Sequence, residues 1–131
     1  MGPSPVRYLI DTNVWIDAIA GRLPADSFIR LTVQADWVGY SAITRLELFG
    51  LPGLKADEEQ KMSALLKNFP EIGIDSKTID HAIMIRKAVR IKIPDAIIAA
   101  SAILAESSLL TRNTDDFKGI CGLTVVNPYQ S

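Results

Sequence analysis

Short, almost continuous hydrophobic runs recur along the chain, and longer segments between them have apolar residues every three or four positions. The runs have the length of strands that are buried on both faces of a sheet. The longer segments have the spacing of amphipathic helices. The expected strands are residues 6–10, 36–40, 71–74, 108–111 and 123–127. The expected helices are residues 12–21, 25–34, 41–50, 56–69, 75–89 and 94–107.

Residues at the expected helix ends support this assignment. Ser41 stands where it can cap the helix at 41–50, and Pro94 stands in the first turn of the helix at 94–107. The segment 56–69 begins with acidic residues, which favour a helix N-terminus. Its apolar residues then follow the i, i+3, i+4, i+7 spacing of one helix face, at Met62, Leu65, Leu66 and Phe69.

Strands and helices alternate along the whole chain, which predicts the α/β class. We expect a three-layer α/β/α sandwich around a mostly parallel, five-stranded sheet. The chain has 131 residues, a common size for one domain, and no internal repeat or linker interrupts it. The sequence therefore predicts a single domain over residues 1–131.

Composition narrows the class of protein further. Hydrophobic residues make up 48% of the chain, which is typical of a folded domain and excludes a disordered chain. No apolar run reaches the roughly 18 residues of a membrane span, and the start, MGPSPVRYLID, lacks the apolar core of a secretory signal. Cys121 is the only cysteine, which excludes an intramolecular disulfide and points to a reducing cytoplasm. The formal net charge of −1 predicts no global attraction to nucleic acid, so such binding would need a local basic patch.

Acidic residues from distant segments are expected to meet at one edge of the sheet. Asp11 directly follows the first strand, Asp95 lies in the first turn of a helix, and Glu47 lies one and a half turns into another. Asp115 and Asp116 follow the strand at 108–111 after a short turn. Ligands of open parallel sheets bind beyond the carboxyl ends of the strands, where helix N-termini also lie. This edge is therefore the candidate functional site.

Each acid has an ordinary structural explanation when it is taken alone. Asp11 would be a good N-cap, and Asp95 would interact favourably with a helix dipole, by roughly 0.3–1 kcal/mol. Glu47 could pair with Arg45 or Arg86, and acids in loops are common. Together, however, several carboxylates within a few ångströms would repel one another strongly. A divalent cation would relieve that repulsion, and a set of oxygen ligands favours Mg²⁺ or Mn²⁺. A His/Cys metal site is not expected, because His81 and Cys121 stand alone.

Four segments in order then carry a resemblance to a known family. They are LIDTNVWID, SAITRLELFG, IPDAIIAASAILAES and LLTRNTDDF, with LTVVNPY behind the last, and they span residues 8 to about 128. This order resembles the PIN-domain ribonucleases, and more narrowly the VapC-type toxins of toxin–antitoxin pairs. The resemblance implies an α/β/α sandwich with a parallel sheet over the whole chain.

The resemblance also implies roles for individual residues. The catalytic and metal-binding acids would be Asp11, Glu47, Asp95 and Asp116. Many PIN domains have an aspartate where this chain has Asn113, and VapC-like members often have asparagine there with an acid just before the phenylalanine. Asp116 is therefore preferred as the fourth acid, and Asp115 is the weaker candidate. The supporting residues would be Thr12, Asn13, Asn113 and Asp115.

A basic segment could guide an RNA backbone into this site. The stretch RKAVRIK, residues 86–92, holds four basic residues and no acid just before Asp95. The candidate RNA-binding residues are Arg45, Arg90, Lys92, Arg112 and Lys118. Arg86 and Lys87 have an alternative role, because basic residues late in a helix interact favourably with its dipole.

The function that the resemblance implies is a Mg²⁺-dependent endoribonuclease, with Mn²⁺ as a possible substitute, that leaves a 3′-hydroxyl and a 5′-phosphate. Its partners would be RNA, a cognate antitoxin protein and a second copy of the chain in a homodimer, with no membrane association. Large apolar residues near the N-terminal helices are candidates for the antitoxin groove. They are Trp15, Leu23, Phe28, Trp37, Phe49 and Leu51.

Other functions are compatible with the same motifs. A catalytically silent PIN-like module that binds RNA or protein is one alternative. A PIN nuclease that acts in RNA processing or on DNA is another. A phosphatase of the haloacid dehalogenase type is not favoured, because it needs an acid two positions after Asp11, where this chain has Asn13.

Overall fold

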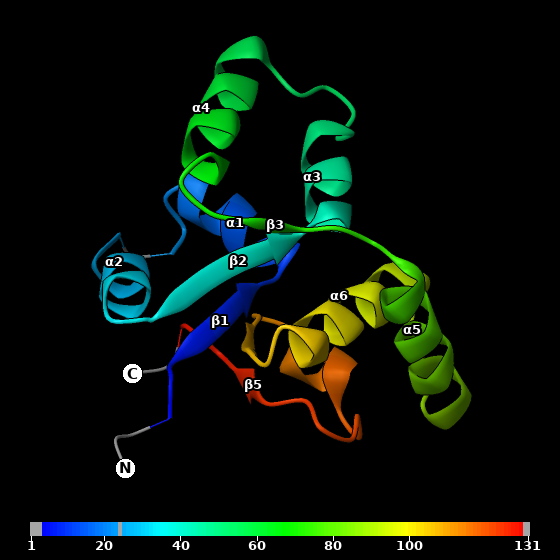
Figure 1. The fold of residues 1–131 in the computed structure, drawn as a ribbon. Helices are drawn as coiled ribbons and strands as arrows, with labels where there is room; N and C mark the ends of the chain where they lie inside the picture. The colour runs from blue at the N-terminus through cyan, green and yellow to red at the C-terminus, as the bar shows by residue number, and fades with distance from the viewer. Residues whose placement is uncertain (1–3, 24, 130–131) are drawn as a thin grey trace.

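The fold alternates strands and helices as the sequence predicts (Figure 1). The computed structural model describes residues 4–23 and 25–129, without the side chains of residues 25 and 26. The strands are β1 (Arg7–Ile10), β2 (Trp37–Ser41), β3 (Glu71–Ile72), β4 (Ser108–Leu110) and β5 (Val125–Val126). The helices are α1 (Thr12–Ile19), α2 (Ala25–Val33), α3 (Ala42–Phe49), α4 (Ala56–Leu66), α5 (Ser76–Ala88) and α6 (Ile93–Leu104), with a 3₁₀ helix η1 (Thr114–Phe117).

The five strands form one sheet in the order β3-β2-β1-β4-β5, and all four pairings are parallel. The prediction of a mostly parallel, five-stranded sheet is therefore confirmed. β1 lies at the centre, so its carboxyl end and that of β4 meet at the same edge. This arrangement puts Asp11 and Thr111, which directly follow these two strands, side by side.

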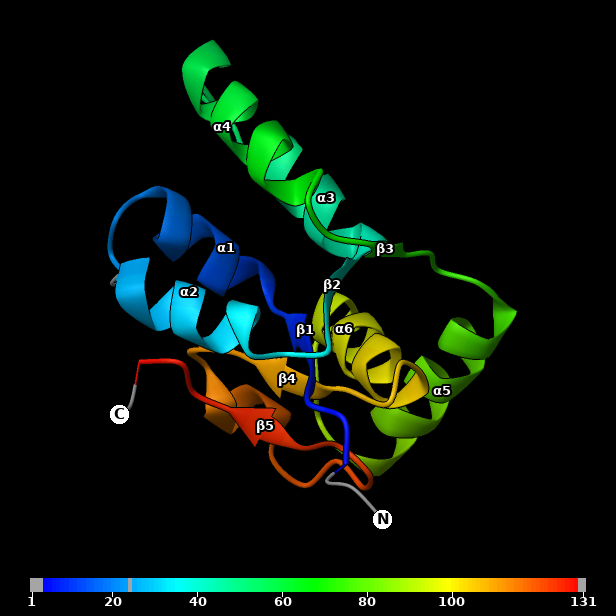
Figure 2. The same ribbon diagram turned by 60° about the vertical axis from the view of Figure 1, so that its left-hand side comes forward.

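Adjacent residues of the central strands face two separate cores. Leu9 and Leu109 pack into the core that α5 and α6 cover, whereas Ile10 and Leu110 pack into the core of α1, α3 and α4. This is the two-residue period of a strand that is buried on both faces. Figure 2 shows α1 and α2 on one side of the sheet and α5 and α6 on the other. The prediction of a three-layer sandwich is confirmed.

Several expected elements are shorter than predicted, most clearly α4, α6, β3 and β5. α6 ends at Leu104, and Glu106 beyond it has a φ of +52°, outside the helical region. α4 ends at Leu66, because the Asn68 side chain bonds the Ala64 and Leu65 carbonyls and Pro70 disfavours helical backbone at Phe69. β3 and β5 have only two residues each. Both are edge strands with a single neighbour in the sheet, so fewer backbone hydrogen bonds hold them extended.

The N-terminal apolar residues mostly belong to the core. Trp15 is fully buried, its indole N–H donates to the Ile10 carbonyl at 3.2 Å, and it packs edge-on against Phe28 and Phe69. Leu23 is buried as well, whereas Leu51 is 39% exposed. Phe28 and Phe49 pack against the same core, and Trp37 packs against the core on the opposite face of the sheet. Trp15 and Leu23 are therefore not accessible to a partner, and an antitoxin groove at the N-terminal helices stays a prediction.

Candidate active site

Asp11 occupies the turn from β1 into α1. Its backbone N–H donates to the Leu110 carbonyl at 2.9 Å, which continues the pairing of β1 with β4 by one residue. One carboxylate oxygen accepts from the Thr12 N–H at 2.8 Å and caps α1. The other accepts from the Thr111 hydroxyl at 2.7 Å. The residue is only 4% exposed. Asp11 is therefore both a helix cap and a buried acid at the ligand edge of the sheet.

Glu47 is held beside Asp11 by a chain of hydroxyl groups. The Thr12 hydroxyl lies 2.7 Å from Glu47 Oε1 and 2.9 Å from the Thr44 hydroxyl. The contact joins α1 to α3 and uses Thr12, which the sequence assigned a supporting role. The ion pairs that the sequence allowed for Glu47 do not form, because Arg45 pairs with Glu71 and Arg86 Nε donates to the Ile91 carbonyl.

Asp95 and Asp116 approach the same edge from the C-terminal half. Pro94 starts α6, and Asp95 follows in its first turn. Burial raises the pKa of Asp95, the negative charges of Asp116 and Glu47 raise it further, and Lys92 opposes the shift. Asp95 and Asp116 therefore lie within electrostatic reach of each other, although they are 21 positions apart in the sequence.

Burial raises the pKa of Asp11 from 3.8 to about 6, against the hydrogen bonds from Thr111 and Thr12. The charges of Asp95 and Glu47 raise it as well. The fold thus brings the four predicted acids into one interacting group. Asp115 is not among the charges that raise the pKa of Asp11 or Asp95, and its exposed carboxylate pairs with Lys118 at 2.9 Å.

The four acids do not form a closed cage for a metal ion. Among residues 4–23 and 25–129, no three His, Cys, Asp or Glu side chains lie close enough to enclose a metal ion. Mg²⁺ does not require such a cage, since it usually keeps several waters and takes one or two protein carboxylates. The chemistry of the donors, all carboxylate oxygens, agrees with that ion.

A hollow of about 490 Å³ lies against the C-terminal acids. Asp95, Asp115 and Asp116 line it together with the basic residues Arg86, Arg90, Lys92 and Lys118. Three of the five predicted RNA-binding residues therefore lie beside the acids. The other two are engaged by carboxylates, Arg45 by Glu71 and Arg112 by Asp17.

Asp17 is an important residue that the sequence reasoning missed. It lies fully buried in α1 and accepts hydrogen bonds from Arg22, Arg112 and Tyr129. Burial would raise the pKa of Asp17, but the bonds from Tyr129 and Arg22 and the charge of Arg112 outweigh burial and lower it. The available signal was an acid within the apolar stretch NVWIDAI, where a charge needs a partner.

The remaining supporting residues lie close to these groups. The Asn113 N–H donates to the Thr111 hydroxyl at 3.0 Å, so Asn113, the residue before η1, lies directly beside the partner of Asp11. Asn13 is half-buried in the first turn of α1. Both asparagines therefore lie next to the residues that position Asp11.

Comparison with known proteins agrees with this geometry. The sequence model of the family described as PIN domain matches residues 8–123. The chain belongs to the PIN domain family. The resemblance to VapC-type PIN proteins that the motifs indicated is likewise confirmed. No curated protein sequence matches this PIN domain significantly.

Solved structures with the same fold come from toxin–antitoxin complexes. A chain of a toxin–antitoxin complex from Klebsiella pneumoniae is 36% identical, with a TM-score of 0.77, and the match covers 95% of this PIN domain and 99% of that chain. A chain of VapBC2 from Rickettsia felis, bound to promoter DNA, is 24% identical with a TM-score of 0.80. The match covers 93% of this PIN domain and 98% of that chain. A chain of DNA-bound VapBC from Salmonella typhimurium is 21% identical with a TM-score of 0.80. The match covers 94% of this PIN domain and 98% of that chain. The last two likenesses concern the fold alone.

Across the described part of the chain, no helix has both the length and the hydrophobicity that crossing a bilayer requires.

Proposed function

We propose that this PIN domain is a metal-dependent endoribonuclease and the toxin of a type II toxin–antitoxin pair. The observation that carries the proposal is the group of four acids at the carboxyl edge of the sheet. Burial raises the pKa of both Asp11 and Asp95, and the negative charges of neighbouring acids raise it further. A partly buried group of like charges is costly for a fold, and it is useful where a cation and a phosphate have to meet.

The proposed cofactor is Mg²⁺, with Mn²⁺ as a possible substitute. Asp11 and Asp95 would hold the ion, and Glu47 and Asp116 would complete its surroundings directly or through water. When bound, the ion would supply an activated water and would neutralise charge on the phosphate. Thr12 orients Glu47, Thr111 orients Asp11, and Asn113 donates its N–H to the Thr111 hydroxyl.

RNA is the proposed substrate, with cleavage to a 3′-hydroxyl and a 5′-phosphate. Arg90, Lys92 and Lys118 line the hollow beside Asp95 and would contact the backbone phosphates. Arg45 and Arg112 could join them only by leaving their carboxylate partners.

The proposed protein partners are a cognate antitoxin and a second copy of the chain. The Klebsiella pneumoniae structure, a toxin–antitoxin complex at 36% identity, supports an antitoxin partner. We place the protein in the cytoplasm, where its single cysteine would stay reduced.

The first experiment measures cleavage of a mixed, structured RNA and of a matched DNA by the purified chain, freed of any bound antitoxin. We expect cleavage of the RNA with Mg²⁺ or Mn²⁺ and none with EDTA. Asp116→Asn should lose at least about tenfold in rate, as for other residues that support a metal. Asp115→Asn is the matched control and should retain most activity, because its exposed pair with Lys118 is weak.

Each other outcome points to a different function. Cleavage of DNA but not RNA would identify a DNA nuclease. RNA binding without metal-dependent cleavage would identify a catalytically silent module. Equal losses in the two variants would contradict the choice of Asp116 as the fourth acid.

A further inference from the structure

The segment between α5 and α6 brings positive charge directly to the acids. Arg86 and Lys87 lie in the last turn of α5, and α6 begins only five residues after that helix ends. Arg90 and Lys92 lie in this short connection, and Asp95 follows in the first turn of α6. Figures 1 and 2 both show α5 packed along α6, so the connection lies at the end of this helix pair.

Two hollows meet along this segment. The first, of about 490 Å³, contains Asp95 and Asp116. The second, of about 410 Å³, extends along the end of α5 to Lys87. Arg86, Arg90 and Ile91 line both, so the surface from the acids to Lys87 is continuous. We call Arg86, Lys87, Arg90 and Lys92 the α5 track.

Among the described residues, no carboxylate forms an ion pair with the basic side chains of the α5 track. In the described part of the chain, the acids that form ion pairs are Asp17, Glu71 and Asp115, and none of them pairs with the track. Arg86 is fixed through the Ile91 carbonyl, which orients its guanidinium at 3.2 Å without cancelling the charge. Lys92 is the track residue that acts electrostatically on Asp95.

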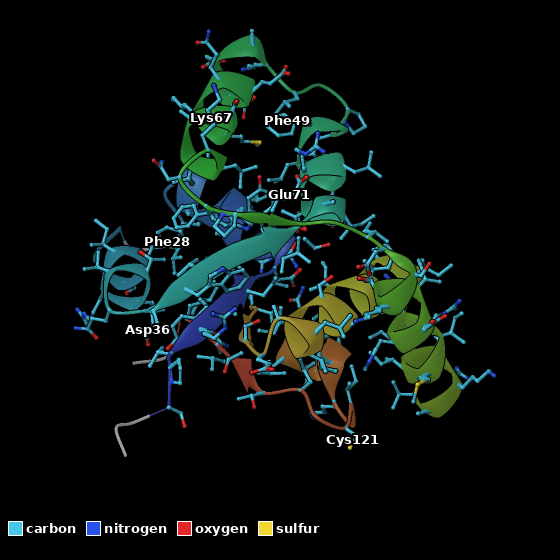
Figure 3. All side chains as sticks on the ribbon, in the orientation of Figure 1. Phe28, Asp36, Phe49, Lys67, Glu71 and Cys121 are labelled. Carbon is cyan, nitrogen blue, oxygen red and sulfur yellow. The ribbon has the colours of Figure 1, made fainter. Side chains whose placement is uncertain are left out.

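The predicted RNA-binding residues outside the track differ in this respect, because each of them forms an ion pair with a carboxylate. Arg45 of α3 forms an ion pair with Glu71, the edge-strand residue labelled in Figure 3. Arg112 pairs with the buried Asp17. Favourable interaction with the α5 dipole accounts for Arg86 and Lys87, but Arg90 and Lys92 lie beyond the end of that helix. A common anionic ligand accounts for all four.

We propose that single-stranded RNA binds asymmetrically, with the phosphates on one flank of the reacting bond lying along the α5 track. The inference rests on the proposed function, which identifies the ligand as RNA. It adds the direction in which the RNA strand extends away from the acids. Because the track contacts phosphates, its contribution should be independent of base sequence and sensitive to salt. The opposite flank, toward α3, should contribute little.

The test measures binding of a fluorescein-labelled single-stranded RNA to the full chain by fluorescence anisotropy in EDTA, over a series of KCl concentrations. The double variant Lys87→Gln/Arg90→Gln should bind about tenfold more weakly at low salt. Its plot of log affinity against log salt should be shallower by about 1.4, since each phosphate contact on a single strand contributes about 0.7. A gel of the RNA after each titration verifies that it stays intact.

Two controls separate the track from overall charge. Lys61→Gln/Lys67→Gln removes the same charge from the exposed surface of α4, where Lys67 is labelled in Figure 3, and should bind within twofold of the wild type. Arg45→Gln should also bind within twofold, whereas Arg90→Gln alone should lose severalfold. Equal losses in the two double variants, equal losses at Arg45 and Arg90, or no RNA binding by the wild type would each overturn the proposal.

Failure of this proposal and failure of the nuclease proposal are distinguishable. Binding is measured without metal and without cleavage. A track that binds RNA in a chain that never cuts would contradict only the nuclease activity. Metal-dependent cutting with unchanged binding in the track variant would contradict only the asymmetric path.

Discussion

Asp11→Asn should abolish metal-dependent RNA cleavage and at the same time make the metal-free protein more stable at neutral pH. The rate should fall at least about 100-fold, because metal-ion catalysis supplies several kcal/mol and each 1.36 kcal/mol corresponds to about tenfold. The fold should persist, since asparagine is also a good N-cap and can still accept from the Thr12 N–H.

The gain in stability follows from the raised pKa of Asp11. Its pKa is about 6 in the folded chain against 3.8 without the fold, so the folded state binds the extra proton between these values. The contribution of Asp11 to the free energy of unfolding is therefore fully present below about pH 4 and is lost as the pH rises through 6. The loss is at most about 3 kcal/mol, from roughly two pKa steps. The asparagine variant should lack this pH dependence.

Urea denaturation of both proteins between pH 4 and pH 8 in EDTA measures the difference. Asp75→Asn is the matched control, because Asp75 also caps a helix, but its hydrogen bonds with Thr78 lower its pKa. That variant should be less stable than the wild type above the acid range. Mg²⁺ should stabilise the wild type and leave Asp11→Asn almost unchanged. A lower stability of Asp11→Asn at pH 7 in EDTA would contradict the inference that burial and the neighbouring acids raise the pKa of Asp11.

Asp17→Asn should destabilise the fold by about 3 kcal/mol at neutral pH, since hydrogen bonds to charged groups contribute about 1.5–3 kcal/mol each. The change removes the negative charge with which Arg22 and Arg112 form ion pairs. It also leaves one side-chain oxygen to accept from the three donors Arg22, Arg112 and Tyr129. Because the pKa of Asp17 is lowered, this stability is present above the unfolded pKa of 3.8 and is lost as the pH falls through the folded value. Its pH dependence is thus opposite to that of Asp11.

Asp80→Asn, on the exposed surface of α5, is the control for the Asp17 variant and should change stability by no more than about 0.5 kcal/mol. Tyr129→Phe removes a single donor to the charged carboxylate and should cost about 1.5 kcal/mol, the lower end for one such hydrogen bond. Urea denaturation at pH 7 measures all three. If Asp17→Asn were no worse than Asp80→Asn, the buried ion-pair network would have no net stabilising role.

The sequence by itself determined the class of the fold and predicted the place of the candidate site. The alternation of apolar runs with helical segments predicted a parallel sandwich, because each run is buried on both faces and must be covered by helices. Leu9 and Ile10 show this directly, since these neighbours point into different cores. The position of Asp11 after the first strand was sufficient to locate the ligand edge.

Only the tertiary structure decided which charges are free and which are engaged. Asp17 and Arg112 are 95 positions apart, and Asp17 and Tyr129 are 112 apart, so no local pattern connects them. The same holds for Arg45 with Glu71 and for the influence of Asp116 on Asp95. The lengths of β3 and β5 depended on their places at the sheet edges. Periodicity follows from local backbone geometry, whereas the partner of a side chain depends on which distant segments the folded chain brings beside it.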